Sequence, residues 1–124
     1  MNGTERETGS AGPENQGHIP PARALRRAVL DGDIEAARRA LADGASVDEI
    51  DPATGLAALH LAAGLNDLAM TRFLVGECSA SFFPDRFGRW PTLVAAENHV
   101  SDALSDYIVE QEAAWLASHP EQAP

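Results

Sequence analysis

The chain has 124 residues, and its 19 acidic residues against nine basic ones give a formal net charge of −10 at pH 7. This length fits one small domain with one main core. The charge argues against nucleic acid as a ligand, because phosphates repel an acidic surface, and it favours a protein partner with a basic surface. Cys78 is the only cysteine, which excludes an internal disulfide and a zinc site built from several cysteines.

Residues 1–21 are rich in Gly, Glu, Asn, Ser, Thr and Pro, with Ile19 their only large aliphatic residue apart from Met1. Such a segment buries too little apolar surface to offset the entropy lost on ordering, so we predict a disordered tail. A docking tether and a plain solvated leader both remain open for it. No apolar run is typical of a secretory signal, and none approaches the roughly 20 residues that span a bilayer. These features predict a soluble, cytoplasmic protein.

Two helices are predicted next. The stretch "PARALRRAVLDGD" carries apolar residues at helical spacing and ends at Gly32, where glycine can adopt a left-handed cap conformation. The stretch "DIEAARRALADG" follows at once, with Asp33 as its N-cap and Gly44 at its end. Glu35 and Arg39, four positions apart with the acid first, are expected to form a surface ion pair.

The polar loop "GASVDEIDPATG" separates this helix pair from a second copy of the pattern. Four features recur, the first two after 34 residues and the last two after 33: Gly32 as Asn66, Gly44 as Cys78, Gly55 as Gly88, and Ala62-Ala63 as Ala95-Ala96. Two periods this close indicate one repeat with a single inserted residue, most simply in "DPATG".

Three segments resemble ankyrin repeats. "GLAALHLAAGLNDLAMTRFL" is similar to a repeat whose first helix opens with a Thr-Pro-Leu-His-x-Ala pattern, "GRWPTLVAAENHVSDAL" to a degenerate copy, and "ALRRAVLDGDIEAARRALADGASVD" to an N-terminal capping repeat. The resemblance implies an all-α fold, an ankyrin-repeat solenoid of helix-turn-helix pairs over residues 22–118. Together with the strong Ala and Arg bias, it suggests a bacterial protein.

The last helix is longer than a repeat of this family requires and forms an extended C-terminal cap. It is predicted from Ser101, a good N-cap, to Ala117 or Ser118, with residues 119–124 as a flexible tail. Its apolar stripe consists of Leu104, Tyr107, Ile108 and Trp115. Its acidic face consists of Asp102, Asp106 and Glu110, interpreted either as a docking face for a basic partner or as a solvated face. Three acids on one exposed helix lack the encircling loop of a calcium site, so no metal is predicted there.

His60 stands between two leucines in a segment without another ionisable group, and a metal ligand, a catalytic base and a structural pin are its candidate roles. The other histidines, His18, His99 and His119, have no metal-site spacing to it, and Cys78 has no base beside it that makes it a nucleophile. The resemblance implies the structural role, in which this histidine hydrogen-bonds backbone groups of adjoining loops. We therefore predict no enzyme, no metal and no cofactor.

The resemblance also implies that a protein partner binds the ridge of the first helices and the loop tips. Transferred position by position, the ridge is Arg27, Leu30, Asp31, Leu61, Gly64, Leu65, Val94, Glu97 and Asn98, and the loop tips are Glu49, Ile50, Phe83, Asp85, Arg86 and Phe87. Leu61 and Leu65 are one helical turn apart and form the expected apolar patch. Ordinary surface leucines, or cover by the N-terminal tail, are the other interpretation.

Trp90 follows the aromatic loop "ASFFPDRFGR" and has two interpretations. It either packs with Phe82, Phe83 or Phe87 as an aromatic cluster, or stands exposed as an interface anchor, and nearby arginines can stack on these rings. The predicted function is non-catalytic protein–protein recognition by a stand-alone adaptor or inhibitor. The alternative is a homo-oligomeric structural subunit that uses the aromatic loop and the C-terminal helix.

Overall fold

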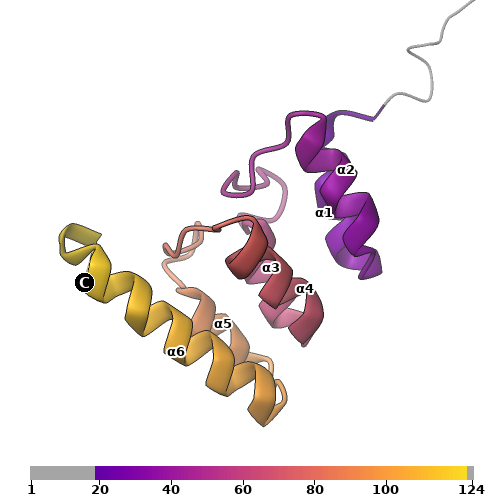
Figure 1. Cartoon of the computed structure of the whole chain (residues 1–124). Coiled ribbons are helices and arrows are strands. Elements are labelled where there is room, and N and C mark those ends of the chain that lie inside the picture. Colours follow the sequence, from indigo (N-terminus) through magenta and orange to yellow (C-terminus); the bar gives the residue numbers. More distant parts are fainter. Residues whose placement is uncertain (1–18, 123–124) are drawn as a thin grey trace, which may run out of the picture.

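The computed structural model describes residues 19–122, and every regular element in this range is helical, which confirms the all-α prediction for it. The elements are α1 (Pro21–Asp31), α2 (Ile34–Ala42), α3 (Ala58–Gly64), α4 (Leu68–Arg72), its π-helical continuation η1 (Phe73–Glu77), α5 (Pro91–Glu97), α6 (Asp102–Ser118) and a 3-10 turn η2 (Pro120–Gln122). Figure 1 shows three helix pairs, α1 with α2, α3 with α4 and α5 with α6, side by side in chain order. Residues 1–18, most of the predicted tail, lie outside the described range.

Each helix pair turns through one residue with a left-handed backbone. These residues are Gly32, Asn66 and His99, with φ angles of 68°, 62° and 53°. The second helix of each pair then begins at a side chain that accepts a backbone N–H: Asp33, Asp67 and Ser101, with N···O distances of 3.0, 3.0 and 3.2 Å. The helix boundaries predicted from Gly32, Asp33 and Ser101 are confirmed.

The repeat periods of 34 and 33 residues differ for another reason than the predicted single insertion. Because α4 continues as a π-helix, the left-handed residue after it is Ser79 rather than Cys78, 35 positions after Gly44. The loop from Gly44 to the N-cap Ala57 then spans 13 positions, and that from Ser79 to the N-cap Trp90 spans 11. The first long loop is therefore two residues longer than the second, and the second helix pair is one residue longer than the first. Their difference gives the single net insertion that was expected in "DPATG".

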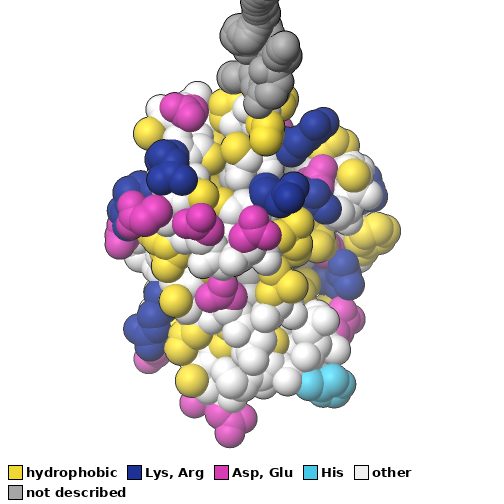
Figure 2. Space-filling view, turned by 90° about the vertical axis from the view of Figure 1, so that its right-hand side faces the viewer, with side chains coloured by type: hydrophobic (Ala, Val, Ile, Leu, Met, Phe, Trp, Pro, Cys, Tyr) yellow, Lys and Arg dark blue, Asp and Glu magenta, His cyan; other side chains and the backbone are white. Residues whose placement is uncertain are grey.

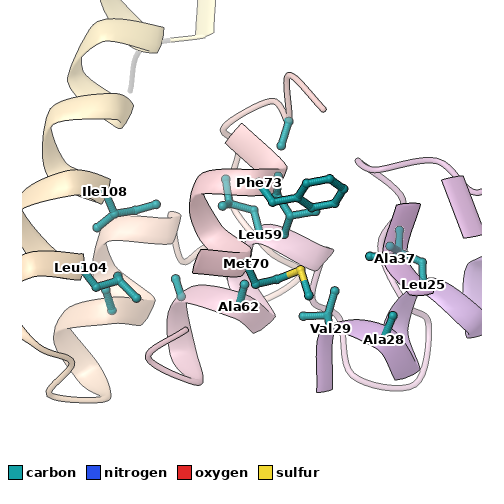
Figure 3. Close-up of a cluster of buried hydrophobic side chains, with 14 of the residues drawn as sticks. Leu25, Ala28, Val29, Ala37, Leu59, Ala62, Met70, Phe73, Leu104 and Ile108 are labelled. Atoms are coloured by element: carbon teal, nitrogen blue, oxygen red, sulfur yellow. The ribbon is translucent and has the colours of Figure 1, made fainter. Parts of the chain in front are cut away.

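The core runs without a break from one helix pair to the next. Figure 3 shows its large side chains, with Leu25 and Val29 from the first pair, Leu59 and Met70 from the second, and Leu104 and Ile108 from the third. Buried alanines lie between them at positions 28, 37, 62, 63 and 95, and their small size lets the helices approach closely. Because a single pair buries too little apolar surface alone, we expect the three pairs to fold as one unit.

The apolar stripe of α6 is confirmed. Leu104 and Ile108 are fully buried, and Tyr107 and Trp115 are partly buried. The Arg72 guanidinium of α4 lies 4.7 Å from the centre of the Tyr107 ring. The side of α6 that carries Tyr107 therefore faces the second helix pair.

Aromatic side chains pack where the loop after Ser79 meets α5 and α6. Phe82 packs against Trp115 of α6, with ring centres 6.3 Å apart, and Trp90 packs against the core at the N-cap of α5. His119 stacks on Trp115 with ring centres 4.0 Å and planes 10° apart. His119, which was predicted to begin a flexible tail, thus packs on α6, and the exposed residues 120–122 after it form the turn η2.

Two equivalent glycines offer a test of how closely the long loops approach each other. Gly55 and Gly88 are both left-handed, with φ angles of 76° and 82°. A Cβ atom on Gly55 would lie 2.8 Å from Cβ of Arg86, whereas one on Gly88 meets nothing within 4 Å. The backbone strain of alanine, roughly 1–2 kcal/mol, is common to both sites. We expect Gly55→Ala to lower the free energy of unfolding by about 1 kcal/mol more than Gly88→Ala in urea titrations, because only Gly55 is crowded. Equal losses would contradict the close approach.

Candidate functional site

A groove separates α1 from the loop 43–57 and the first turn of α3. Its volume is about 490 Å³. Its apolar wall includes Leu25, Leu56, Ala57 and Leu61, and its charged rim consists of Arg23, Arg26, Glu49 and Asp51. An apolar wall with a few polar groups at fixed places is the usual composition of a binding site in proteins.

An ion pair crosses this groove. Nε of Arg26 on α1 lies 2.8 Å from Oδ2 of Asp51 in the loop, although its N–H is not aligned for a hydrogen bond, so the contact is mainly electrostatic. Asp51 also shapes the loop, because its carboxylate accepts the N–H of Ala53 at 3.1 Å and the hydroxyl of Thr54 at 3.3 Å. Both partners of the pair are partly exposed, so solvent screens it and its contribution to stability is about 0–1 kcal/mol. Its structural effect is to hold the loop beside α1.

Two exposed leucines lie farther along the two helices that line the groove. Leu61 lies in its wall, Leu65 follows one turn later with 47% of its surface exposed, and Leu30 at the end of α1 is 41% exposed. Since α1 and α3 contact each other, the predicted residues Leu30, Leu61 and Leu65 belong to neighbouring helices. Ile50 is exposed on the loop that forms the other wall. Of these four predicted residues, Leu61 is the one whose side chain lines the groove.

The part of the predicted ridge on α5 needs correction. Val94 is only 4% exposed, because Gly64 has no side chain and a Cβ there would lie 3.3 Å from Cγ1 of Val94. Val94 thus fills the space between α3 and α5 and is not a surface residue. Asn98 is exposed, and its side-chain amide donates to the carbonyl of Val94 at 2.8 Å. Glu97 is exposed and accepts Nη1 of Arg89 at 3.2 Å.

The other predicted charged residues lie on exposed helix faces. Arg27 forms an ion pair with Asp31 one turn later, with 3.5 Å between Nε and Oδ2. Asp102, Asp106 and Glu110 are exposed along α6. The expected pair between Glu35 and Arg39 is replaced by one between Glu35 and Arg38, at 3.6 Å. Exposed ion pairs of this kind contribute little to the free energy of folding, so a binding partner can form ion pairs with these residues without unfolding the chain.

Arg86 joins the tips of the two long loops. Its backbone N–H donates to the carbonyl of Gly55 at 2.9 Å, and its guanidinium donates to the carbonyl of Pro52 at 2.7 Å. Phe87 beside it is exposed, and the guanidinium groups of Arg86 and Arg89 lie 5.3 and 5.4 Å from its ring centre. These distances are within the range of cation–π attraction. The loop tips therefore present an aromatic ring flanked by two cations.

His60 connects the second helix pair to the following loop. It is 1% exposed, and its Nδ1 accepts the N–H of Ala57 at 3.3 Å. Nε2 therefore carries the proton and donates to the carbonyls of Phe83 and Arg89 at 3.0 and 3.1 Å. Burial lowers the pKa of His60 below its usual 6.5, against opposing effects of the Asp85 charge and the two carbonyls. Both ring nitrogens are engaged with backbone groups, which is the geometry that a structural role requires.

Cys78 lies in a smaller recess between α2 and η1. Burial raises the pKa of its thiol, and the neighbouring Glu77 carboxylate raises it further. The thiol is therefore protonated at neutral pH and is a weak nucleophile. Within residues 19–122 no group of three or more His, Cys, Asp or Glu side chains is arranged to hold a metal ion.

Sequence reasoning missed Arg23, Arg26 and Asp51 as groove residues. One signal was present, because Asp51 recurs as Asp85 after 34 residues and both carboxylates organise a loop. The arginines carry no such signal. Arg26 reaches its partner in a loop far along the chain, and that pairing follows only from the packing of α1 beside the loop.

The comparisons with known proteins leave the groove and the exposed surfaces as the basis for function. No protein-family model matches the chain, and no curated protein is significantly similar to it in sequence. None of the helices in residues 19–122 is both long enough and apolar enough to cross a bilayer. Because one fold supports many functions, the helical fold by itself assigns no activity to the chain.

Proposed function

We propose that the chain is a non-catalytic protein-interaction module, a short ankyrin-repeat array that serves as a stand-alone adaptor or inhibitor. The observation that carries the proposal is the groove of about 490 Å³ lined by α1, the loop 43–57 and α3, together with the exposed Leu30 and Leu65 farther along these two helices. Apolar anchors at the centre of a binding surface supply most of the affinity, and a charged rim supplies selectivity. The groove and its rim have this composition.

Three further observations support an ankyrin-like array. The helix pairs follow each other at a nearly constant period, and the turn of each pair has its left-handed residue at an equivalent place. The imidazole of His60 bonds to carbonyls of the next loop, as the resemblance implies. The inner helices α1, α3 and α5 contact each other in order.

The rim also indicates what kind of segment the groove accepts. Arg23 and Arg26 line it from α1, and Glu49 and Asp51 line it from the loop. A partner segment with an apolar side chain flanked by charges of both signs matches this arrangement.

The cytoplasm is the proposed compartment of the module. Cys78 is a free cysteine, which supports a reducing environment.

A Leu30→Glu, Leu65→Glu double variant tests the proposal. Both leucines are more than two-fifths exposed, so we expect the free energy of unfolding to change by no more than about 1 kcal/mol. A partner captured by the wild type from a lysate of the source organism should bind the double variant at least about tenfold more weakly. Ala42→Glu, Ala69→Glu is the matched control and should retain that partner, because both alanines are exposed on α2 and α4, away from the groove. Equal binding by all three proteins would contradict a binding surface that includes Leu30 and Leu65.

A further inference from the structure

The last helix pair has two unlike sides. On one side it meets the second pair, where Tyr107 lies under Arg72 and the N–H of Ser101 donates to the Asn66 side chain at 3.0 Å. Val109 follows Tyr107 by two residues and is therefore turned by about 200° around α6. It points away from the second pair, and its side chain is 48% exposed.

Leu93 of α5 shares this outer side. The N–H of Thr92 donates to Oε1 of Glu112 at 3.0 Å, and its hydroxyl lies 3.5 Å from the carbonyl of Ile108. These contacts hold the first turn of α5 against the middle of α6. Leu93 follows Thr92 directly and is 45% exposed. Two large aliphatic side chains are thus nearly half exposed on neighbouring helices.

The position of Leu93 within its helix explains what this side is suited for. Leu93 is the third residue of α5, and His60 is the third residue of α3. In α3 that residue faces the following unit of the array and bonds to its loop. In α5 the same position holds an aliphatic side chain, and no described residue packs over it as the loop packs over His60. A neighbour on this side would be held by apolar packing instead of hydrogen bonds.

The acidic residues around this face favour a binding partner with basic residues. From Leu93 to Gln122 the chain has six acidic residues and neither Lys nor Arg. Asp102 and Asp106 are exposed and lie within about 20° and 60° of Val109 around α6. The opposite end of the array, which faces the viewer in Figure 2, shows arginine and acidic side chains interspersed. A second copy docked by the same face would bring the two acidic sets together, which is unfavourable.

We propose that the outer face of α5 and α6, centred on Leu93 and Val109, docks an amphipathic helix of another protein that is rich in Lys or Arg. The apolar stripe of that helix packs on Leu93 and Val109, and its cations lie next to Asp102 and Asp106. Helices bind by this combination of apolar anchors and flanking charge in many complexes. The face is separate from the groove, so the module has a second binding surface.

Two synthetic helical peptides test this surface. Both carry leucine at every third or fourth position, and the remaining positions are lysine in one peptide and glutamate in the other. We expect the lysine peptide to shift the methyl NMR signals of Leu93 and Val109 in the wild-type protein, and the glutamate peptide to leave them unchanged. Shifts centred on Leu30 and Leu65, or no binding of the lysine peptide, would overturn the proposal.

Matched variants separate apolar docking from plain charge attraction. A Leu93→Ser, Val109→Ser double variant should bind the lysine peptide about tenfold more weakly, while Leu30→Ser, Leu65→Ser keeps the wild-type Kd. Asp102→Asn, Asp106→Asn should reduce the salt dependence of the Kd. Equal affinity in both serine variants would overturn the assignment of the face. A mass that depends on concentration in analytical ultracentrifugation for the wild type, but not for Leu93→Ser, Val109→Ser, would also overturn the proposal. It would show that a second copy of the chain occupies this face.

Discussion

Replacing Asp85 by alanine is expected to lower the free energy of unfolding by about 3–5 kcal/mol, a large part of the stability of a domain of this size. The sequence predicted Asp85 as a partner-binding loop tip, but its carboxylate is fully shielded from solvent, and its Oδ1 accepts the N–H groups of Phe87 and Arg89, both at 2.9 Å. Its Oδ2 accepts Nε of Arg89 at 2.9 Å. Alanine leaves two backbone donors and a guanidinium without this partner, and unpaired buried donors are costly.

Asp51 is the matched control, because it organises the preceding loop in the same way. Its side chain is partly exposed and its bonds to Ala53 and Thr54 are longer, so Asp51→Ala should cost only about 1 kcal/mol. The loss of stability in Asp85→Asn should lie between these two values. Its amide oxygen can accept the backbone N–H groups, but its NH₂ group is a donor placed against the donor Nε of Arg89. Urea unfolding followed by circular dichroism measures all three. A loss in Asp85→Ala no larger than in Asp51→Ala would show that the carboxylate does not hold the loop.

The same carboxylate should make the chain sensitive to strong acid. Burial by itself raises the pKa of Asp85, but the N–H groups of Arg89 and Phe87 and the guanidinium of Arg89 outweigh it, and the net pKa lies below the usual 3.8. The unfolded chain then binds the proton more tightly than the folded one. The stabilisation is fully present above the unfolded pKa and is lost as the pH falls through the folded value.

The elements that could be predicted from sequence are those specified by neighbouring residues. Gly32, Asp33 and Ser101 mark helix ends through their own backbone preference or side-chain oxygen, and the structure places the ends there. The helical spacing of apolar residues along α6 likewise predicts that Leu104 and Ile108 are buried, as the structure shows. In each case the cause lies within one turn of the residue.

The features that sequence reasoning missed depend on distant residues. Val94 is buried because Gly64, on another helix, leaves space for it, so transferring the ridge by position fails there. Phe82 packs against Trp115, which lies more than 30 positions later on α6. The π-helical turn Phe73–Glu77 carries no local signal, since it absorbs one residue inside a helix that is otherwise regular. The groove itself forms only when α1 lies beside the loop 43–57.

Replacing His60 by leucine should destabilise the chain by about 3 kcal/mol at mildly alkaline pH, and this difference should shrink in weak acid. Leucine fills most of the space but leaves the N–H of Ala57 and the carbonyls of Phe83 and Arg89 without their buried partner. In the wild type the pKa of His60 is lowered on folding, so the unfolded chain binds the proton more tightly. Wild-type stability is therefore complete above the unfolded pKa of about 6.5 and falls below it, by at most about 1.4 kcal/mol per pH unit.

Urea unfolding at a series of pH values, for the wild type and His60→Leu, measures this difference directly. Burial is the main cause of the lowered pKa, and a proton on Nδ1 would also meet the N–H of Ala57, which that atom accepts in the folded chain. The variant has no such site, and its stability should lack that slope. An NMR titration of the His60 ring in the folded wild type should give a midpoint below 6.5. A midpoint at or above that value, or parallel pH profiles for the two proteins, would mean that His60 does not join the helix pair to the next loop as a neutral imidazole.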